Sequence, residues 1–157
     1  MVRGIDYIGV GVGAIIFDQK GRIFLAKRGV KSRNEAGKWE CPGGALEFGD
    51  SFEKTLKREM KEEYGIEIEV KEFLDVCNHI IPEEKQHWVS PSFLCRVRLG
   101  EPRILEPQKC SVIGWFTIDE IVKMPITIVT KYNIKSLRKR YSDVLPDFYI
   151  NEPAQRG

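Results

Sequence analysis

Long hydrophobic runs are what this 157-residue sequence lacks most clearly. No stretch reaches the roughly 20 consecutive apolar residues that a membrane-spanning helix needs. Residues 10–17 are apolar, but no small-residue cleavage site follows them, so they do not match a secretory signal peptide. We therefore expect residues 10–17 to form a buried strand, and we expect a cytoplasmic protein without a membrane partner.

Cysteine pairs and an excess of charge of either sign are also lacking. The four cysteines are never in the C-x-x-C spacing of zinc sites, and 42% hydrophobic residues suffice for a core without a disulfide framework. We expect reduced, mostly buried thiols. The net charge of +2 gives no electrostatic reason to expect a nucleic-acid partner.

The length and the pattern of apolar residues predict one mixed α/β domain over residues 1–141. A polar stretch with glycine near both ends, residues 29–38, predicts an exposed loop. The expected strands are residues 8–17, 22–28, 66–78, 87–99 and 111–117. The expected helices are residues 51–64, 118–124 and 127–140, and an irregular tail is expected over residues 142–157.

Three glutamates gather on one face of the helix expected over residues 51–64. On a helix, residues three and four apart share a face, so Glu59, Glu62 and Glu63 project together. These charges repel one another, which predicts a cation beside them. Carboxylate oxygens suit Mg²⁺ or Mn²⁺, and an open cluster leaves coordination positions for a diphosphate. The alternative is a solvated acidic helix face.

The start of the same helix carries two capping candidates. Either Asp50 or Ser51 can cap it, and Asp50 with Glu53 has the spacing of a capping box. Arg58 points about 100° away from Glu59 around the helix axis. From there it can orient a carboxylate or the preceding loop through charge-assisted hydrogen bonds.

Residues 44–66 resemble the signature of the Nudix hydrolases. That signature is Gly, five residues, Glu, seven residues, Arg-Glu, an aliphatic residue, any residue, Glu-Glu, any residue, Gly and an aliphatic residue. Every fixed position matches except the first Glu, where this chain has Asp50. Residues 39–44 and 114–116 are similar to flanking elements of the family, so the resemblance covers roughly residues 8–140. It implies a Nudix-type α/β/α sandwich with a mixed β-sheet.

The resemblance also implies a metal site. Glu59 and Glu63 would be the main ligands of Mg²⁺, with Mn²⁺ as the alternative, and Glu62 would support them directly or through a water. A backbone carbonyl of Gly43 or Gly44 would join them, since glycine lets the backbone approach a ligand closely. Arg58 would position the whole segment.

Catalysis in this family uses a carboxylate base whose position differs between members. The candidates here are Glu62 in the helix and Glu47 before it, with Glu83 and Glu84 further along the chain as alternatives. Asp50 is one methylene shorter than the usual Glu and is a further contributor. The implied reaction is in-line attack on phosphorus by a water that a metal ion and a carboxylate activate.

Four side chains and one glycine are candidates for substrate contact. Arg28 and Lys38 could hold phosphate oxygens, and Gly43 allows close approach of the ligand. His79 could touch a base or a phosphate, the alternative being a structural histidine. Phe116 could stack on a nucleobase.

The substrate is less defined than the chemistry. The chain looks similar to Nudix enzymes that convert a (d)NTP to a nucleoside monophosphate and pyrophosphate. Pro82, downstream of Gly65, keeps ADP-ribose or another nucleotide sugar open. A different class is an idle Nudix domain that senses a ligand or docks a partner, but such domains often lose the glutamates found here. The expected partner is a small nucleotide, and a homodimer is open because relatives often dimerise.

Overall fold

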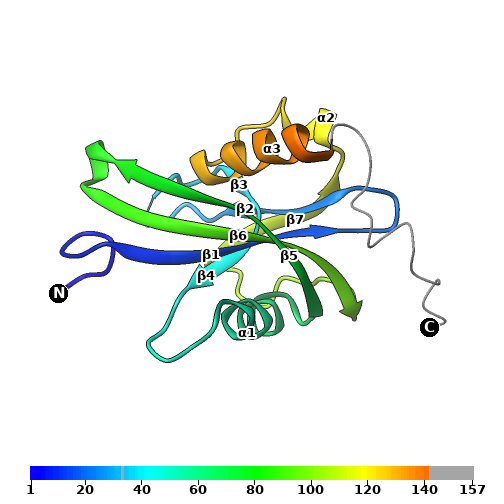
Figure 1. The fold of residues 1–157 in the computed structure, drawn as a ribbon, viewed down its shortest axis with the longest axis horizontal. Coiled ribbons are helices and arrows are strands. Elements are labelled where there is room, and N and C mark those ends of the chain that lie inside the picture. Colours follow the sequence, from blue (N-terminus) through cyan, green and yellow to red (C-terminus); the bar gives the residue numbers. More distant parts are fainter. Residues whose placement is uncertain (33, 142–157) are drawn as a thin grey trace.

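In the computed structural model, which describes residues 1–32 and 34–141, a mixed sheet lies between helices on its two faces (Figure 1). α1 (Phe52–Tyr64) covers one face, and α2 (Ile118–Ile121) and α3 (Ile128–Tyr141) lie on the other. The described strands are β1 (Gly9–Phe17), β2 (Ile23–Arg28), β3 (Trp39–Glu40), β4 (Gly43–Ala45), β5 (Glu67–Ile81), β6 (Gln86–Leu99) and β7 (Cys110–Phe116). The predicted sandwich is confirmed, and the predicted tail, residues 142–157, lies outside the described residues.

The strand β1 organises the sheet. It pairs in parallel with β6 along one edge, and the sheet runs in the order β3-β2-β1-β6-β5. Two strands share the other edge of β1. β2 pairs with β1 at Phe17, and β4 pairs with β1 at Gly11–Gly13. Since β2 continues instead alongside β3 and β7, it diverges from β1. This divergence leaves space between the strands.

The hairpin of β5 and β6 is longer than the sequence predicts. Strand pairing continues through Ile81 and Gln86, so the expected loop shrinks to the short 3₁₀ turn η1 (Pro82–Glu84). The reason is the alternation near the tip: His79 and Ile81 are buried while Ile80 is exposed, which suits a strand with one covered face. His79 therefore sits within a strand, directly opposite Trp88.

Two clusters of buried side chains fill the sandwich, one on each face of the sheet. Leu56, Met60 and Tyr64 of α1 belong to the first cluster. Ile134 and Leu137 of α3 belong to the second. All four cysteines are buried and free, as predicted. Within the described residues, no helix is both long and apolar enough to cross a membrane.

The helix α1 begins and ends at the capping residues the sequence offers, with one correction. Ser51 is the N-cap and accepts a hydrogen bond from the backbone N–H of Lys54. The predicted capping box of Asp50 with Glu53 is therefore wrong, and Asp50 is left to make other contacts. At the other end Gly65 adopts a left-handed conformation, with φ of 69°, that terminates the helix.

Candidate active site

A cleft of about 630 Å³ lies where β1 and β2 diverge. On the α1 side it is lined by Gly44 of β4, by Glu63 and by the turn before β7. On the α3 side it is lined by His79 of β5, Trp88 of β6 and the start of α3. The cleft therefore connects the two faces of the sheet through the gap that the strand pairing leaves.

Two of the predicted metal ligands form a pair at the α1 end of this cleft. The carboxyl of Glu63 donates a hydrogen bond to the carboxylate of Glu59. Gly44 lies so close that a Cβ at this position would be 2.4 Å from Cγ of Glu59. Next to it, a Cβ at Gly43 would be 2.1 Å from the carbonyl oxygen of Val12. Both glycines are thus required by close packing. The predicted close approach of a ligand to their backbone stays a prediction.

Ionising both Glu59 and Glu63 costs free energy unless a cation lies beside them. Burial raises the pKa of the Glu59 carboxyl. Burial and the neighbouring charge of Glu59 raise the pKa of Glu63 to about 8. A metal ion would displace such a shared proton, because a carboxyl must lose its proton to act as a ligand.

Lys109 places a positive charge beside the pair. Its ammonium nitrogen lies 3.0 Å from Oε2 of Glu106 and 3.9 Å from Oε1 of Glu63. The hydrogen bond with Glu106 is the main cause of the raised pKa of Lys109. The sequence alone does not place Lys109 or Glu106 in the site, because only the fold brings their turn to the end of α1.

The third predicted ligand, Glu62, is exposed and does not line the cleft. Among the residues that the structure describes, no three or more His, Cys, Asp or Glu side chains converge to hold a metal ion. A metal ion at Glu59 and Glu63 would therefore complete its shell with backbone, water or substrate oxygens. Mg²⁺ accepts such a set, because it usually takes one or two carboxylates and keeps several waters. The role of Glu62 stays a prediction.

The remaining predicted catalytic residues stand at the start of α1. Asp50 accepts a hydrogen bond from Arg58, and Nζ of Lys54 lies 2.8 Å from its other oxygen. Hydrogen bonds from these two cations hold the pKa of Asp50 below its usual range. Glu47 is exposed and forms an ion pair with Arg3 at 3.2 Å. Neither Asp50 nor Glu47 lines the cleft, and their catalytic roles stay predictions.

Arg28 lines the cleft, but its guanidinium is already engaged. It donates to both oxygens of Glu40, at 3.0 and 2.9 Å, and to the backbone and side-chain oxygens of Asn34. Burial raises the pKa of Glu40, and the charge of Arg28 opposes that rise. The geometry favours a structural role for Arg28 over the predicted contact with phosphate.

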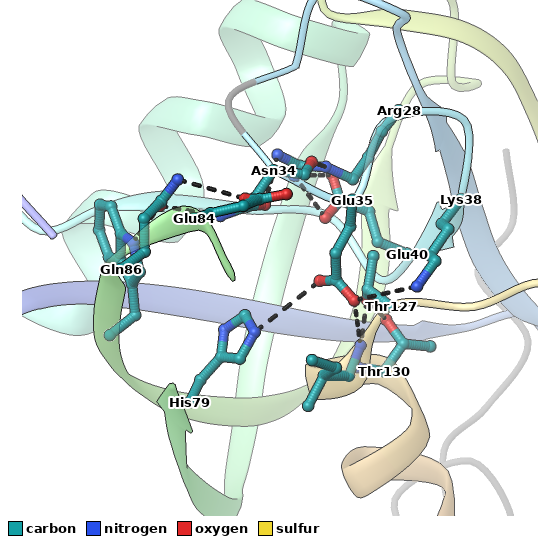
Figure 2. A network of polar contacts seen from close by, with 12 residues as sticks. Arg28, Asn34, Glu35, Lys38, Glu40, His79, Glu84, Gln86, Thr127 and Thr130 are labelled. Atoms are coloured by element: carbon teal, nitrogen blue, oxygen red, sulfur yellow. Dashed lines mark hydrogen bonds and ion pairs between the residues drawn. The ribbon is translucent and has the colours of Figure 1, made fainter. Parts of the chain in front are cut away.

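The loop after β2 crosses the α3 side of the cleft, and Figure 2 shows how its side chains are held. Asn34 donates to Gln86 at 3.1 Å. Glu35 accepts from the backbone N–H of Ile128, at the start of α3, at 2.9 Å. Lys38 lies 3.6 Å from Glu35 and does not line the cleft. The loop predicted over residues 29–38 is therefore tied to the hairpin and to α3.

The aromatic side chain predicted to stack on a base, Phe116, does not line the cleft. Phe116 packs edge-on against Trp39, with ring centroids 5.2 Å apart, in the core on the α3 face. It is absent from the cleft lining, whereas Trp88 contributes to it. The prediction that Phe116 stacks on a base finds no support in this packing.

Comparison with known proteins finds one domain family that covers most of the chain. The NUDIX domain family matches residues 8–138. The chain is 36% identical over 159 residues to an RNA pyrophosphohydrolase of Orientia tsutsugamushi (strain Boryong), covering 90% of this chain and 89% of that one. It is 42% identical over 122 residues to a CTP pyrophosphohydrolase of Escherichia coli (strain K12), covering 74% and 82%.

A solved structure shows the same fold. The MutT NUDIX hydrolase from Burkholderia pseudomallei superposes with a TM-score of 0.77 at 37% sequence identity. The superposition covers 84% of this chain and 99% of that one. The likeness in fold therefore extends over most of this chain.

Proposed function

This chain belongs to the Nudix hydrolase family, and from that premise we propose that it is a Mg²⁺-dependent (d)NTP pyrophosphohydrolase. It would hydrolyse a phosphoanhydride bond to give a nucleoside monophosphate and pyrophosphate. The observation that carries this proposal is the Glu59–Glu63 pair, two carboxyls that share a hydrogen bond beside Gly44 at one end of a cleft.

The residues present fit a divalent cation. Two adjacent carboxylates provide hard oxygen ligands, and the backbone at Gly44 approaches them without a side chain in between. Nudix hydrolases generally use divalent metal ions, and we propose Mg²⁺ here, with Mn²⁺ able to replace it. When bound, the metal would neutralise charge that develops on the phosphate oxygens.

The chain's own groups would hold the substrate around that cation. Lys109 stands within 3.9 Å of Glu63, and its side chain is 58% exposed, so it could turn toward a phosphate oxygen. Glu62 and Glu47 are the proposed bases for the attacking water, because both are exposed carboxylates, one beside Glu63 in α1 and one in the segment before that helix. Arg58 would keep the loop before α1 in place through Asp50.

The cleft and the relative that is named for CTP support a nucleoside triphosphate as the substrate. A volume of about 630 Å³ is in the range of small-molecule sites. One relative is named for CTP, a nucleoside triphosphate, and another for RNA. ADP-ribose and nucleotide sugars are the alternative substrates, and an idle sensor domain is the alternative from a different class.

The test is a substrate panel with product identification. Purified protein with Mg²⁺ is given the common and oxidised nucleoside triphosphates, ADP-ribose, a nucleotide sugar and a 5′-triphosphorylated oligonucleotide, and products are identified by ³¹P NMR. We expect pyrophosphate and a nucleoside monophosphate from triphosphates. AMP and ribose 5-phosphate from ADP-ribose alone would move the assignment to the sugar-nucleotide branch. Binding of nucleotides without any hydrolysis would favour the sensor.

A further inference from the structure

His79 has a buried ring nitrogen without a hydrogen-bond partner. The residue is 5% exposed and lines the cleft on its α3 side. Its Nε2 makes no hydrogen bond within the described residues, and the nearest carboxylate oxygen, Oε2 of Glu35, is 3.9 Å away. A buried polar atom left unpaired costs free energy, so a group that supplies the missing hydrogen bond would bind favourably here.

Glu35 faces the same part of the cleft and is fixed in place. Its backbone has φ of 45°, which a residue other than glycine adopts at a cost. Its side chain is only 7% exposed and is held by the N–H of Ile128 and by Lys38. Figure 2 shows its carboxylate between Lys38 and His79. The strained backbone thus places a carboxylate, a group that only accepts hydrogen bonds, in the cleft wall.

Trp88 adds an aromatic surface beside these two polar groups. It is the cross-strand partner of His79, and cross-strand partners project from the same face of a sheet. Its indole N–H is already used, donating to Gln86 at 2.9 Å. The indole ring is thus fixed beside His79 in the cleft lining. An aromatic ring with nearby acceptors suits a flat, hydrogen-bonding ligand.

We propose that Glu35 and His79 are the specificity-determining pair of this protein and read the hydrogen-bonding edge of the nucleobase. This inference rests on the proposed function, which places a nucleotide in the cleft with its phosphates at Glu63. The nucleoside then extends through the cleft to the α3 side, where Glu35, His79 and Trp88 lie.

The chemistry of the pair selects a base that carries an amino group. The carboxylate of Glu35 accepts hydrogen bonds and repels carbonyl oxygens, so an amino group is favoured over an oxo group or a hydrogen at the same position. Burial lowers the pKa of His79, so its imidazole is neutral near pH 7 and can donate or accept with the neighbouring atom of the base. Cytosine, guanine and adenine present such edges, and uracil and hypoxanthine lack the amino group.

Binding of nucleoside monophosphates in EDTA tests the inference without relying on hydrolysis. Isothermal titration calorimetry compares dCMP with dUMP, dGMP with dIMP, and dAMP with dIMP, because the members of each pair differ at the amino position. We expect the wild type to bind the amino-bearing member at least about 10-fold more tightly in at least one pair. Glu35→Gln should bring that ratio to within about 3-fold.

Matched variants separate recognition from structural damage. His79→Phe should weaken binding of the preferred nucleotide about 10-fold. His87→Phe is the control, because His87 lies on the same hairpin and its ring contacts Asn78 at 2.6 Å. Glu72→Gln is the control for the loss of a carboxylate, because Glu72 is exposed on β5 and pairs with Arg140. Both controls should keep the wild-type selectivity ratio.

A merely structural role would weaken both members of a pair equally and leave their ratio unchanged, and that result for Glu35→Gln overturns the inference. Equal binding of the two members of every pair by the wild type also overturns it. If nucleotides bind selectively but no triphosphate is hydrolysed, the proposed function fails while the specificity pair stands.

Discussion

At the scale of single residues, Glu63 sets the balance between stability and metal binding. Its folded-state pKa of about 8 lies above the ordinary value of 4.5. The metal-free folded state therefore holds this proton more tightly than the unfolded chain does. Its contribution to stability is complete below about pH 4.5 and is lost as the pH rises toward 8. Above pH 8, the charged pair destabilises the metal-free protein.

From this balance we predict that Glu63→Gln stabilises the metal-free protein while it abolishes metal binding. In EDTA at pH 9 the free energy of unfolding should rise by roughly 1–3 kcal/mol, because the amide removes a buried charge. The measurement is urea denaturation with and without Mg²⁺. Wild type should gain stability from Mg²⁺ and the variant should not. If the variant is less stable than the wild type in EDTA, the charge of Glu63 does not destabilise the metal-free protein and this account of the pair is wrong.

Arg28 carries the second prediction at this scale. Its ion pair with Glu40 is only partly buried, with side chains 21% and 29% exposed. Arg28→Gln should therefore lower the free energy of unfolding by about 1–3 kcal/mol. Glu40 loses its opposite charge, and the two oxygens of Asn34 lose the hydrogen bonds that they accept from Arg28. Denaturation and steady-state kinetics are compared on the same sample. A raised KM with an unchanged free energy of unfolding would instead support a direct contact between Arg28 and a phosphate.

At the scale of elements, the packing of β4 against α1 fixes the position of the metal pair. Gly44→Ala would place a Cβ 2.4 Å from Cγ of Glu59, so the carboxylate would have to move. We predict at least about a 10-fold loss of Mg²⁺ affinity, since metal ligands must be held in place closely. The matched control is Gly11→Ala in the same cleft, where the nearest atom would be 3.7 Å away. Equal Mg²⁺ affinity in both variants would refute this role of Gly44.

The start of α1 gives a prediction about stability alone. Ser51→Ala removes the side-chain acceptor for the N–H of Lys54 and should cost about 0.5–2 kcal/mol of unfolding free energy. Asp50 should not compensate, because Arg58 and Lys54 already hold it. Denaturation of Ser51→Ala measures the effect directly. An unchanged midpoint would mean that another group caps the helix.

At the scale of the whole molecule, local patterns predict the longer elements and one end of the site, but not the short strands β3 and β4. The strands β1 and β2 and the helix α1 follow from apolar periodicity and turn residues within each segment. The pairing of Glu59 with Glu63 follows from helical spacing alone. These features depend on neighbours within a few residues, so the sequence reveals them.

The other contributions depend on contacts between distant segments, which no local pattern reveals. Lys109 reaches Glu63 only because its turn packs on the end of α1. Phe116 and Trp115 alternate on β7, and only the packing shows that Trp115 contacts the α1-side core and Phe116 the other. Glu35 lies in a loop that the sequence describes as merely exposed, although it is fixed by the N–H of Ile128.

The central claim is that Glu59 and Glu63 hold the divalent cation on which hydrolysis depends. The most direct measurement is kcat/KM for the best triphosphate as a function of Mg²⁺ concentration in wild type, Glu63→Gln and Glu53→Gln. Glu53 is on the same helix but is exposed and pairs with Lys57, so its variant is the control. We predict saturable Mg²⁺ dependence in wild type and Glu53→Gln, and at least about a 100-fold loss in Glu63→Gln. Equal activity of Glu63→Gln and wild type at every Mg²⁺ concentration would contradict the claim.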